Sequence, residues 1–313
     1  WPLHLWFGDY RVMLWSMMLQ LGLGLVVSHL VAERPYRLAF DRGIMVRSLK
    51  FGWPLLVNGI LMFAVFQGDK LIVGRIMGME ALAIFAMGMT LTLTPTLVMA
   101  KSLQNFFLPQ LTVSDSQFFR FAPITVEVSI AMGVLFILAV MTVGQPLTLL
   151  LLGDRYLALL PILTWFAIMQ GLRVFKAGPA VVALARGQTS NAMFANISRV
   201  AFLPFAWYVA TSSGDLLLVV IAAAAAEAFG HIIAMAQLHY RTGLSFRRVW
   251  LSHLGASAVI AAVICQTYLT SRYADPIQPV GITIGVGVIG CLGLTLLTCP
   301  HLRAYLLHKR AVS

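Results

Sequence analysis

Apolar runs separated by short polar or charged breaks recur along the whole chain. An α-helix rises about 1.5 Å per residue, so about 20 apolar residues cross the roughly 30 Å of bilayer hydrocarbon. The pattern predicts nine membrane-spanning helices, at residues 11–31, 51–77, 80–104, 122–143, 157–186, 190–212, 215–239, 252–271 and 279–299. The expected breaks include AERPYRLAFDRG, VSDSQFFRF, VGQPL, RGQTSN, TSSGD, YRTGLSFRR and SRYADPIQP. We therefore expect an all-α integral membrane protein.

Composition supports this fold class. Of the 313 residues, 60% are hydrophobic and 11% are charged, whereas a soluble domain carries about a quarter charged residues. Cys265, Cys291 and Cys299 lie in or beside apolar runs and lack metal-ligand spacing. The net charge of +11 is better explained by basic residues that flank membrane helices than by nucleic-acid binding. We expect no nucleic-acid partner, no metal and no cofactor.

The distribution of basic residues orients the predicted spans. The loop after the first span is rich in Arg and Lys, and alternation brings further basic residues to the same side. These are Lys101, Arg120, Arg186, Arg241, Arg247, Arg248, Arg303, Lys309 and Arg310. The other side holds only Arg11, Lys70, Arg75, Arg155 and Arg272. Because cytoplasmic loops carry the excess of Lys and Arg, we expect an outside N-terminus and a cytoplasmic C-terminus.

Three charges interrupt the apolar stretch FQGDKLIVGR. Asp69 lies roughly 27 Å along the helix from Phe51, which places Asp69 and Lys70 near the outer end of their span. Neighbouring residues on a helix point about 100° apart, so each is expected to find its partner on another helix or in water. Asp69, Lys70 and Arg75 either form structural contacts at a helix bend or act as an outer gate.

A second group of charges is predicted near mid-depth. Arg173 and Lys176 are three residues apart and share a helix face, and Arg199, Glu227 and His231 reach similar depths on the next two spans. A charged residue at a helix centre costs about 2.5–3.5 kcal/mol on insertion scales. These residues therefore either neutralise one another in structural pairs or line a polar cavity that receives an anionic ligand. His231 is either a packed, hydrogen-bonded histidine or a titrating group.

The span that carries Arg173 and Lys176 also contains Gly178-Pro179. Proline removes a backbone donor and clashes with the preceding turn. We expect a kink there, which could serve as a hinge.

Catalytic patterns are not evident in the sequence. It contains no G-x-S-x-G, no Walker loop and no clustered His or Cys ligands. The predicted loops are also too short for an extramembrane catalytic domain. We expect no catalytic residues and no enzyme activity.

Several short motifs occur together in residues 47–111. They are Phe51-Gly52, Gln67-Gly68-Asp69-Lys70, Gly74-Arg75 and Pro109, and further matching segments are SHLVAERPYRL (28–38) and LLGDRYLALLPIL (151–163). With these motifs the chain resembles the polysaccharide-export (Wzx-like) flippases of the multidrug/oligosaccharidyl-lipid/polysaccharide exporter superfamily.

The resemblance implies two six-helix lobes around a central cavity, followed by two extra helices. This chain would then correspond to helices six to fourteen. Residues 1–43 would hold the last helix of the first lobe and a basic loop, 44–240 the second lobe, and 241–313 two C-terminal helices and a basic tail.

The resemblance also implies a function: alternating-access translocation of a polyprenyl-pyrophosphate-linked oligosaccharide across the bacterial inner membrane. Arg173, Lys176 and Arg199 would bind the head group, and Glu227 and His231 would hold or titrate against them. Membrane lipids and other polysaccharide-assembly proteins are the expected partners. The alternatives are a multidrug-type cation antiporter, a membrane-embedded glycosyltransferase or polymerase, and a structural component that does not transport.

Overall fold

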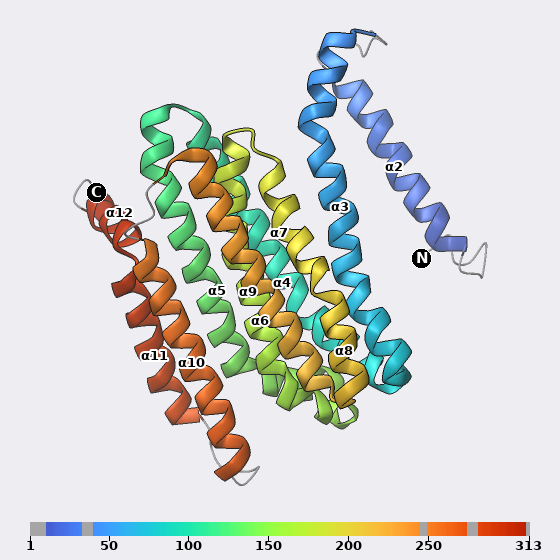
Figure 1. Cartoon of the computed structure of the whole chain (residues 1–313), viewed down its shortest axis with the longest axis vertical. Helices are drawn as coiled ribbons and strands as arrows, with labels where there is room; N and C mark the ends of the chain where they lie inside the picture. The colour runs from blue at the N-terminus through green and yellow to red at the C-terminus, as the bar shows by residue number, and fades with distance from the viewer. Residues whose placement is uncertain (1–10, 33–39, 245–248, 274–280, 311–313) are drawn as a thin grey trace. The chain divides into compact units, whose positions relative to one another are not determined.

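The computed structural model describes residues 11–32, 40–244, 249–273 and 281–310, and every element in these ranges is a helix (Figure 1). The chain forms two compact units, Trp1–Leu49 and Lys50–Ser313. Unit 1 contains α2 (Arg11–Val31) and the first turns of α3 (Arg42–Ile76), and the unit boundary falls within α3. The expected all-α class is confirmed.

Unit 2 holds the rest of α3 and the remaining elements. These are α4 (Gly78–Thr112), α5 (Asp115–Leu152), the 3₁₀ helix η1 (Asp154–Leu159), α6 (Leu160–Ala185), α7 (Ser190–Ala201), α8 (Leu203–Ser213), α9 (Leu216–Thr242), α10 (Val249–Tyr273), α11 (Gly281–Thr298) and α12 (Pro300–Arg310).

Eight spans in the described residues are long and apolar enough to cross a membrane, with α7 and α8 together forming one of them. They correspond to the first eight predicted spans. The ninth prediction, 279–299, contains α11 (Gly281–Thr298), of which Ile289–Thr298 is a shorter apolar helix; residues 279–280 lie outside the described ranges. The protein is thus a multi-pass membrane protein.

Two local expectations were wrong. The sequence VGQPL does not break the chain, because α5 continues through Pro146 and ends at Gly153, whose φ of +67° suits glycine. The predicted span 190–212 is not one helix, since it is interrupted at Phe202, just before Pro204 at the start of α8.

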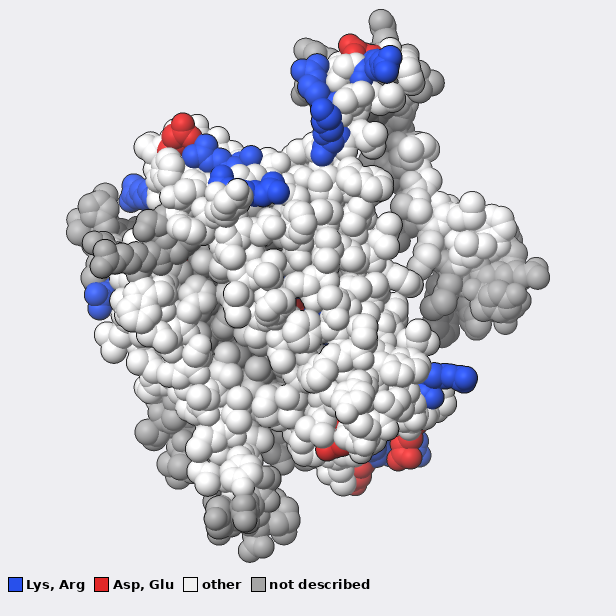
Figure 2. Space-filling view, in the orientation of Figure 1, with Lys and Arg blue, Asp and Glu red and all other residues white. Residues whose placement is uncertain are grey.

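The helices of unit 2 alternate in direction. Figure 1 places the α4–α5 and α6–α7 connections at one end, and the α3–α4, α5–α6 and α8–α9 connections at the other. We call the first end the basic end, because Arg120, Arg186 and Arg241 lie in or near the helix termini there. In Figure 2 the charged side chains of unit 2 gather at its two ends, and the surface between them is almost entirely uncharged. That distribution suits a bilayer around the middle of the bundle.

Helix α6 lies at the centre of unit 2 and packs against α4, α5 and α9. Its contact with α5 depends on two glycines that face each other. A Cβ at Gly133 would lie 2.6 Å from the Gly171 carbonyl oxygen, and one at Gly171 would lie 3.0 Å from the Gly133 oxygen. Small residues let membrane helices approach closely where no hydrophobic effect drives them together.

The Gly178-Pro179 step lies inside α6 and is also packed against α5. Pro179 cannot donate to the carbonyl of Phe175, four residues earlier. The Ser129 hydroxyl of α5 donates to that Phe175 oxygen at 3.2 Å, and a Cβ at Gly178 would lie 2.2 Å from the same hydroxyl. The same hydroxyl lies 2.8 Å from the Val126 oxygen, so its single proton is shared between that oxygen and the Phe175 carbonyl that Pro179 leaves without a donor. The hinge role of Gly178-Pro179 stays a prediction.

The glycine contact predicts a large difference between two Gly→Ala substitutions. Gly133→Ala should lower the free energy of unfolding by about 1–3 kcal/mol, because the new methyl group meets backbone. Gly59→Ala on α3 is the matched control, since a Cβ there has nothing within 4 Å. Thermal unfolding of the purified protein in detergent measures both variants. Equal melting temperatures would contradict the proposed packing.

Candidate functional site

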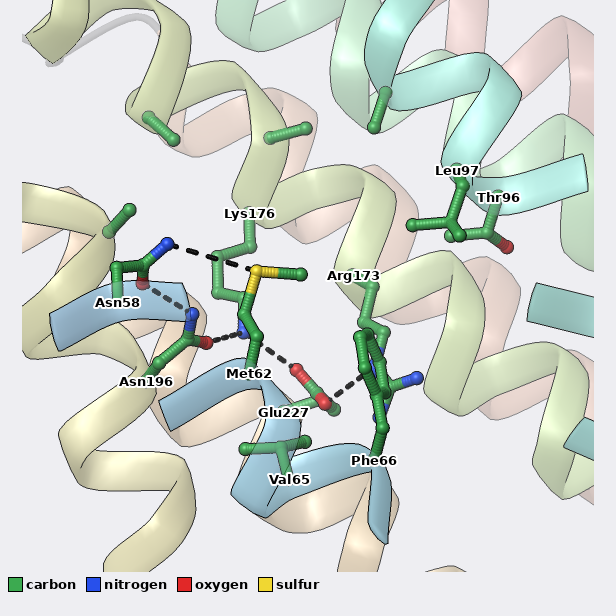
Figure 3. Close-up of a pocket in the computed structure, with 14 residues that line it drawn as sticks. Asn58, Met62, Val65, Phe66, Thr96, Leu97, Arg173, Lys176, Asn196 and Glu227 are labelled. Atoms are coloured by element: carbon green, nitrogen blue, oxygen red, sulfur yellow. Dashed lines mark hydrogen bonds and ion pairs between the residues drawn. The ribbon is translucent and has the colours of Figure 1, made fainter. Parts of the chain in front are cut away.

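A buried carboxylate joins three cationic side chains in the interior of unit 2. Glu227 of α9 accepts through Oε1 from Arg173 Nε at 2.6 Å and from Arg199 Nε at 3.3 Å. Its Oε2 accepts from Lys176 Nζ at 2.9 Å. The predicted convergence of Arg173, Lys176, Arg199 and Glu227 is therefore observed, and Figure 3 shows the two ion pairs of α6 with Glu227.

Asp69 belongs to the same group, although its position along the chain suggested a place near the outer helix end. Arg199 Nη2 donates to Asp69 Oδ2 at 2.5 Å. A Cβ at Gly68 would lie 2.8 Å from Leu203 Cδ1, so the glycine lets α3 approach the start of α8 closely. Asp69 thus finds its partner on another helix, as expected. We call Asp69, Arg173, Lys176, Arg199 and Glu227 the ion cluster.

Neutral polar side chains extend the ion cluster. Lys176 Nζ also donates to Asn196 Oδ1 at 2.9 Å, and Asn196 Nδ2 donates to Asn58 Oδ1 at 2.8 Å (Figure 3). On the other side, Arg173 Nη1 donates to Gln170 Oε1 at 3.1 Å. These amides link α3, α6 and α7 and orient the two cations of α6.

The ion cluster retains positive charge and donor capacity. Its three cations face two carboxylates, so Asp69 reduces the cationic surplus that Glu227 alone would leave. In the part of the chain that the structure describes, Arg173 Nη2 and Arg199 Nη1 are buried without a hydrogen-bond partner. Among the same described residues, Asp69 Oδ1 is likewise buried without a partner, and of these atoms only Arg173 Nη2 belongs to a residue that lines the cavity described next, where a guanidinium donor suits an oxyanion.

A cavity of about 170 Å³ opens beside the ion cluster. Its polar lining consists of Asn58, Thr96, Arg173, Lys176, Asn196 and Glu227, and the remaining walls are apolar. A second cavity of about 380 Å³ shares part of this lining and extends to Lys101, Gln104, Gln188 and Thr189. We call the two together the groove. It runs between α3, α4, α6 and α7, from the connection between α6 and α7 at the basic end to the ion cluster.

The groove divides the ion cluster into two parts. Arg173, Lys176 and Glu227 line it, whereas Arg199 and Asp69 do not. A ligand in the groove would therefore reach the two cations of α6 before it reached Arg199.

His231 contacts a helix outside the predicted second lobe. Its Nε2 lies 2.9 Å from Nε2 of His253 on α10, and the two rings are stacked. Both histidines line a separate cavity of about 390 Å³. The interpretation of His231 as a hydrogen-bonded histidine is thus observed, while its predicted part in ligand binding is not supported by a contact with the ion cluster.

Lys70 and Arg75, the other residues of the predicted outer gate, form no ion pair with any residue in the described ranges. Arg75 is exposed at the end of α3. The gate therefore stays a prediction, and of its three residues only Asp69 lies in the ion cluster.

Glu127 has a structural contact that the sequence did not reveal. It is buried in α5, and its Oε2 accepts from the backbone N–H of Leu302 at 2.7 Å. Leu302 lies in the first turn of α12, where backbone N–H groups lack helical partners and the helix dipole favours negative charge. Glu127 thus caps α12.

No group of three or more His, Cys, Asp or Glu in the described residues could hold a metal ion. The donors of the ion cluster are cationic and match oxyanion chemistry instead.

This geometry defines the class of protein: it is a multi-pass helical membrane protein with a buried cationic site beside a groove. Residues 3–161, half of the chain, match the family described as polysaccharide biosynthesis protein, and the chain belongs to that family. The resemblance to polysaccharide-export proteins is therefore confirmed. No curated protein and no solved structure matches the chain.

The ion cluster predicts that Arg199 is essential for stability. Arg199→Gln would leave Asp69 without its buried partner and Glu227 with one partner fewer, which should cost roughly 3–5 kcal/mol of unfolding free energy. Arg155→Gln is the control, because Arg155 is exposed in η1, and should change stability by less than about 0.5 kcal/mol. Chemical unfolding in detergent micelles measures both. An Arg199 variant as stable as the control would show that the buried pairs contribute little.

Proposed function

We propose that the protein translocates a polyprenyl-pyrophosphate-linked oligosaccharide across the bacterial inner membrane for surface or exopolysaccharide synthesis. The observation that carries the proposal is the groove, which leads from the basic end to Arg173 and Lys176 inside the bundle. Membership of the polysaccharide biosynthesis family supports the same pathway.

The chemistry of the groove suits the proposed head group. A diphosphate carries negative charge and several acceptor oxygens, which Arg and Lys satisfy by charge-assisted hydrogen bonds. The apolar part of the lining includes Ala100, Ala177, Ala180 and Ala192, whose small side chains leave room between α4, α6 and α7. The polyprenyl chain can remain in the bilayer while the head group enters.

Orientation follows from charge. If the basic end faces the cytoplasm, as the positive-inside rule favours, the groove opens to the side on which lipid-linked precursors are made, and the C-terminus is cytoplasmic. Rocking of the second lobe, residues 44–240, against a first lobe would then expose the site to the other side. Lys70 and Arg75 would act near the outer side, Asp69 would stay paired with Arg199, and Gly178-Pro179 would allow α6 to bend.

A cation antiporter of the same superfamily is the main rival. It would need carboxylates that are free to bind a cation. Asp69 and Glu227 are both paired with Arg199, so a resident guanidinium already occupies the space between them. The ion cluster therefore favours an anionic ligand.

Export of surface polymer tests the proposal. In a host whose surface polysaccharide depends on this protein, Arg173→Gln and Lys176→Gln should each reduce surface polymer by about tenfold or more, because each removes a charged ligand contact. Lipid-linked repeat units should accumulate on the cytoplasmic side. Quantification of both pools at matched membrane levels provides the measurement.

Arg155→Gln serves as the control for loss of one positive charge, because Arg155 is exposed and lies outside the groove lining. Normal export by both groove variants would refute the site. Unchanged polymer after deletion of the gene would refute the function.

A further inference from the structure

The hydrogen bonds of Glu227 resemble those expected of a bound phosphate. Its two carboxylate oxygens engage two cations of the same helix, Arg173 Nε at 2.6 Å and Lys176 Nζ at 2.9 Å. Two oxygens of a phosphate group present a similar edge, and Arg and Lys recognise carboxylate and phosphate by the same charge-assisted hydrogen bonds. Glu227 therefore occupies the donors that an oxyanion in the groove would need.

These donors can be exchanged, because they face the groove. Arg173, Lys176 and Glu227 all line the cavity of about 170 Å³ beside the ion cluster. Figure 3 shows the Glu227 carboxylate between the ends of the two cationic side chains, with the Lys176 amine between Glu227 and Asn196. An anion that enters along the groove therefore meets a wall that contains Arg173 and Lys176, with the Phe66 ring packed against the Arg173 guanidinium.

Arg199 lowers the energetic cost of this exchange, because it remains paired with Glu227. A carboxylate that loses both cations of α6 in the protein interior would be an unpaired buried charge, which is costly. Arg199 Nε also donates to Glu227 Oε1, at 3.3 Å, and Arg199 is held by Asp69 away from the groove. Glu227 thus keeps one cationic partner after it releases the other two.

We propose that Glu227 is an internal substitute for the diphosphate of the ligand: it holds Arg173 and Lys176 when no ligand is bound and releases them when the diphosphate arrives. Arg199 and Asp69 remain paired and position Glu227. This proposal rests on the proposed function. In it Glu227 does not bind the ligand but competes with the diphosphate for Arg173 and Lys176.

The exchange also couples binding to helix contacts. Arg173 and Lys176 are on α6, and Glu227 is on α9, so their ion pairs link these two helices directly. A ligand that takes over both cations removes these ion pairs, so that Arg199 of α7 is the cation of the ion cluster that still holds Glu227, while the apolar packing of α6 on α9 remains. Binding of the head group would thereby favour movement of α6 relative to α9. A ligand drives such a change only if it binds one arrangement of the helices more tightly than the other, and the exchange of ion pairs provides that difference.

Binding affinity tests this proposal. The protein is reconstituted in nanodiscs, and the dissociation constants of polyprenyl diphosphate and of uncharged polyprenol are measured by scintillation proximity. Glu227→Gln removes the competing charge but keeps the size of the side chain. It should tighten binding of the diphosphate by about tenfold or more and leave polyprenol binding unchanged, whereas general structural damage would affect both lipids.

Two further variants make the result specific. Glu80→Gln removes an exposed carboxylate at the start of α4 and should not alter the preference for diphosphate. In a Lys176→Gln background, Glu227→Gln should tighten binding less, because one of the released cations is missing. If Glu227→Gln fails to fold, Glu227→Asp retains the charge but shortens the side chain, and should tighten diphosphate binding by a smaller factor.

The outcomes separate this proposal from the function. A wild-type protein that prefers polyprenyl diphosphate over polyprenol, combined with folded Glu227 variants whose preference is unchanged or weaker, overturns the substitute role alone. A wild-type protein without that preference overturns the proposed function as well.

Discussion

The carboxylate of Glu227 is the interaction on which the interior of unit 2 depends. Charges that are unpaired inside a membrane protein are costly, and attraction between them is strong where the effective dielectric constant is low. Glu227 brings Arg173 and Lys176 of α6 together with Arg199 of α7. Arg199 in turn holds Asp69, so that α3 joins the same network. Four helices are thereby connected at one charged point, and the groove ends there.

Much of the fold could be predicted because the thickness of the bilayer fixes the length of each apolar run. The breaks between helices were harder to predict, since they depend on local backbone geometry. Pro146 is accommodated inside α5, whereas Gly153 ends it with a positive φ. Likewise Pro204 divides one predicted span into α7 and α8. A proline in the sequence indicates that one backbone hydrogen bond is missing, but the packing of neighbouring helices decides whether the helix ends there or continues.

The candidate site shows where sequence reasoning stops. Depth along a helix can be counted, and it correctly grouped Arg173, Lys176, Arg199 and Glu227. The neighbour that a side chain meets on another helix cannot be derived by counting residues along the chain. Asp69 lies only seven residues from the end of α3 (Arg42–Ile76), so depth alone sets it apart from the other charges, and its partner depends on how α3 packs against α7 and α8. The contact between His231 and His253 of α10 also arises only from tertiary packing.

The cap on α12 has an evolutionary consequence. Glu127 lies in the middle of the chain, yet its buried carboxylate serves a helix at the far C-terminal end. A lineage that lost α12 would retain a buried acidic group without the backbone N–H that donates a hydrogen bond to it, and one that replaced Glu127 would loosen α12. Selection should therefore couple position 127 to the presence of that helix, so that among relatives the two are inherited or lost together.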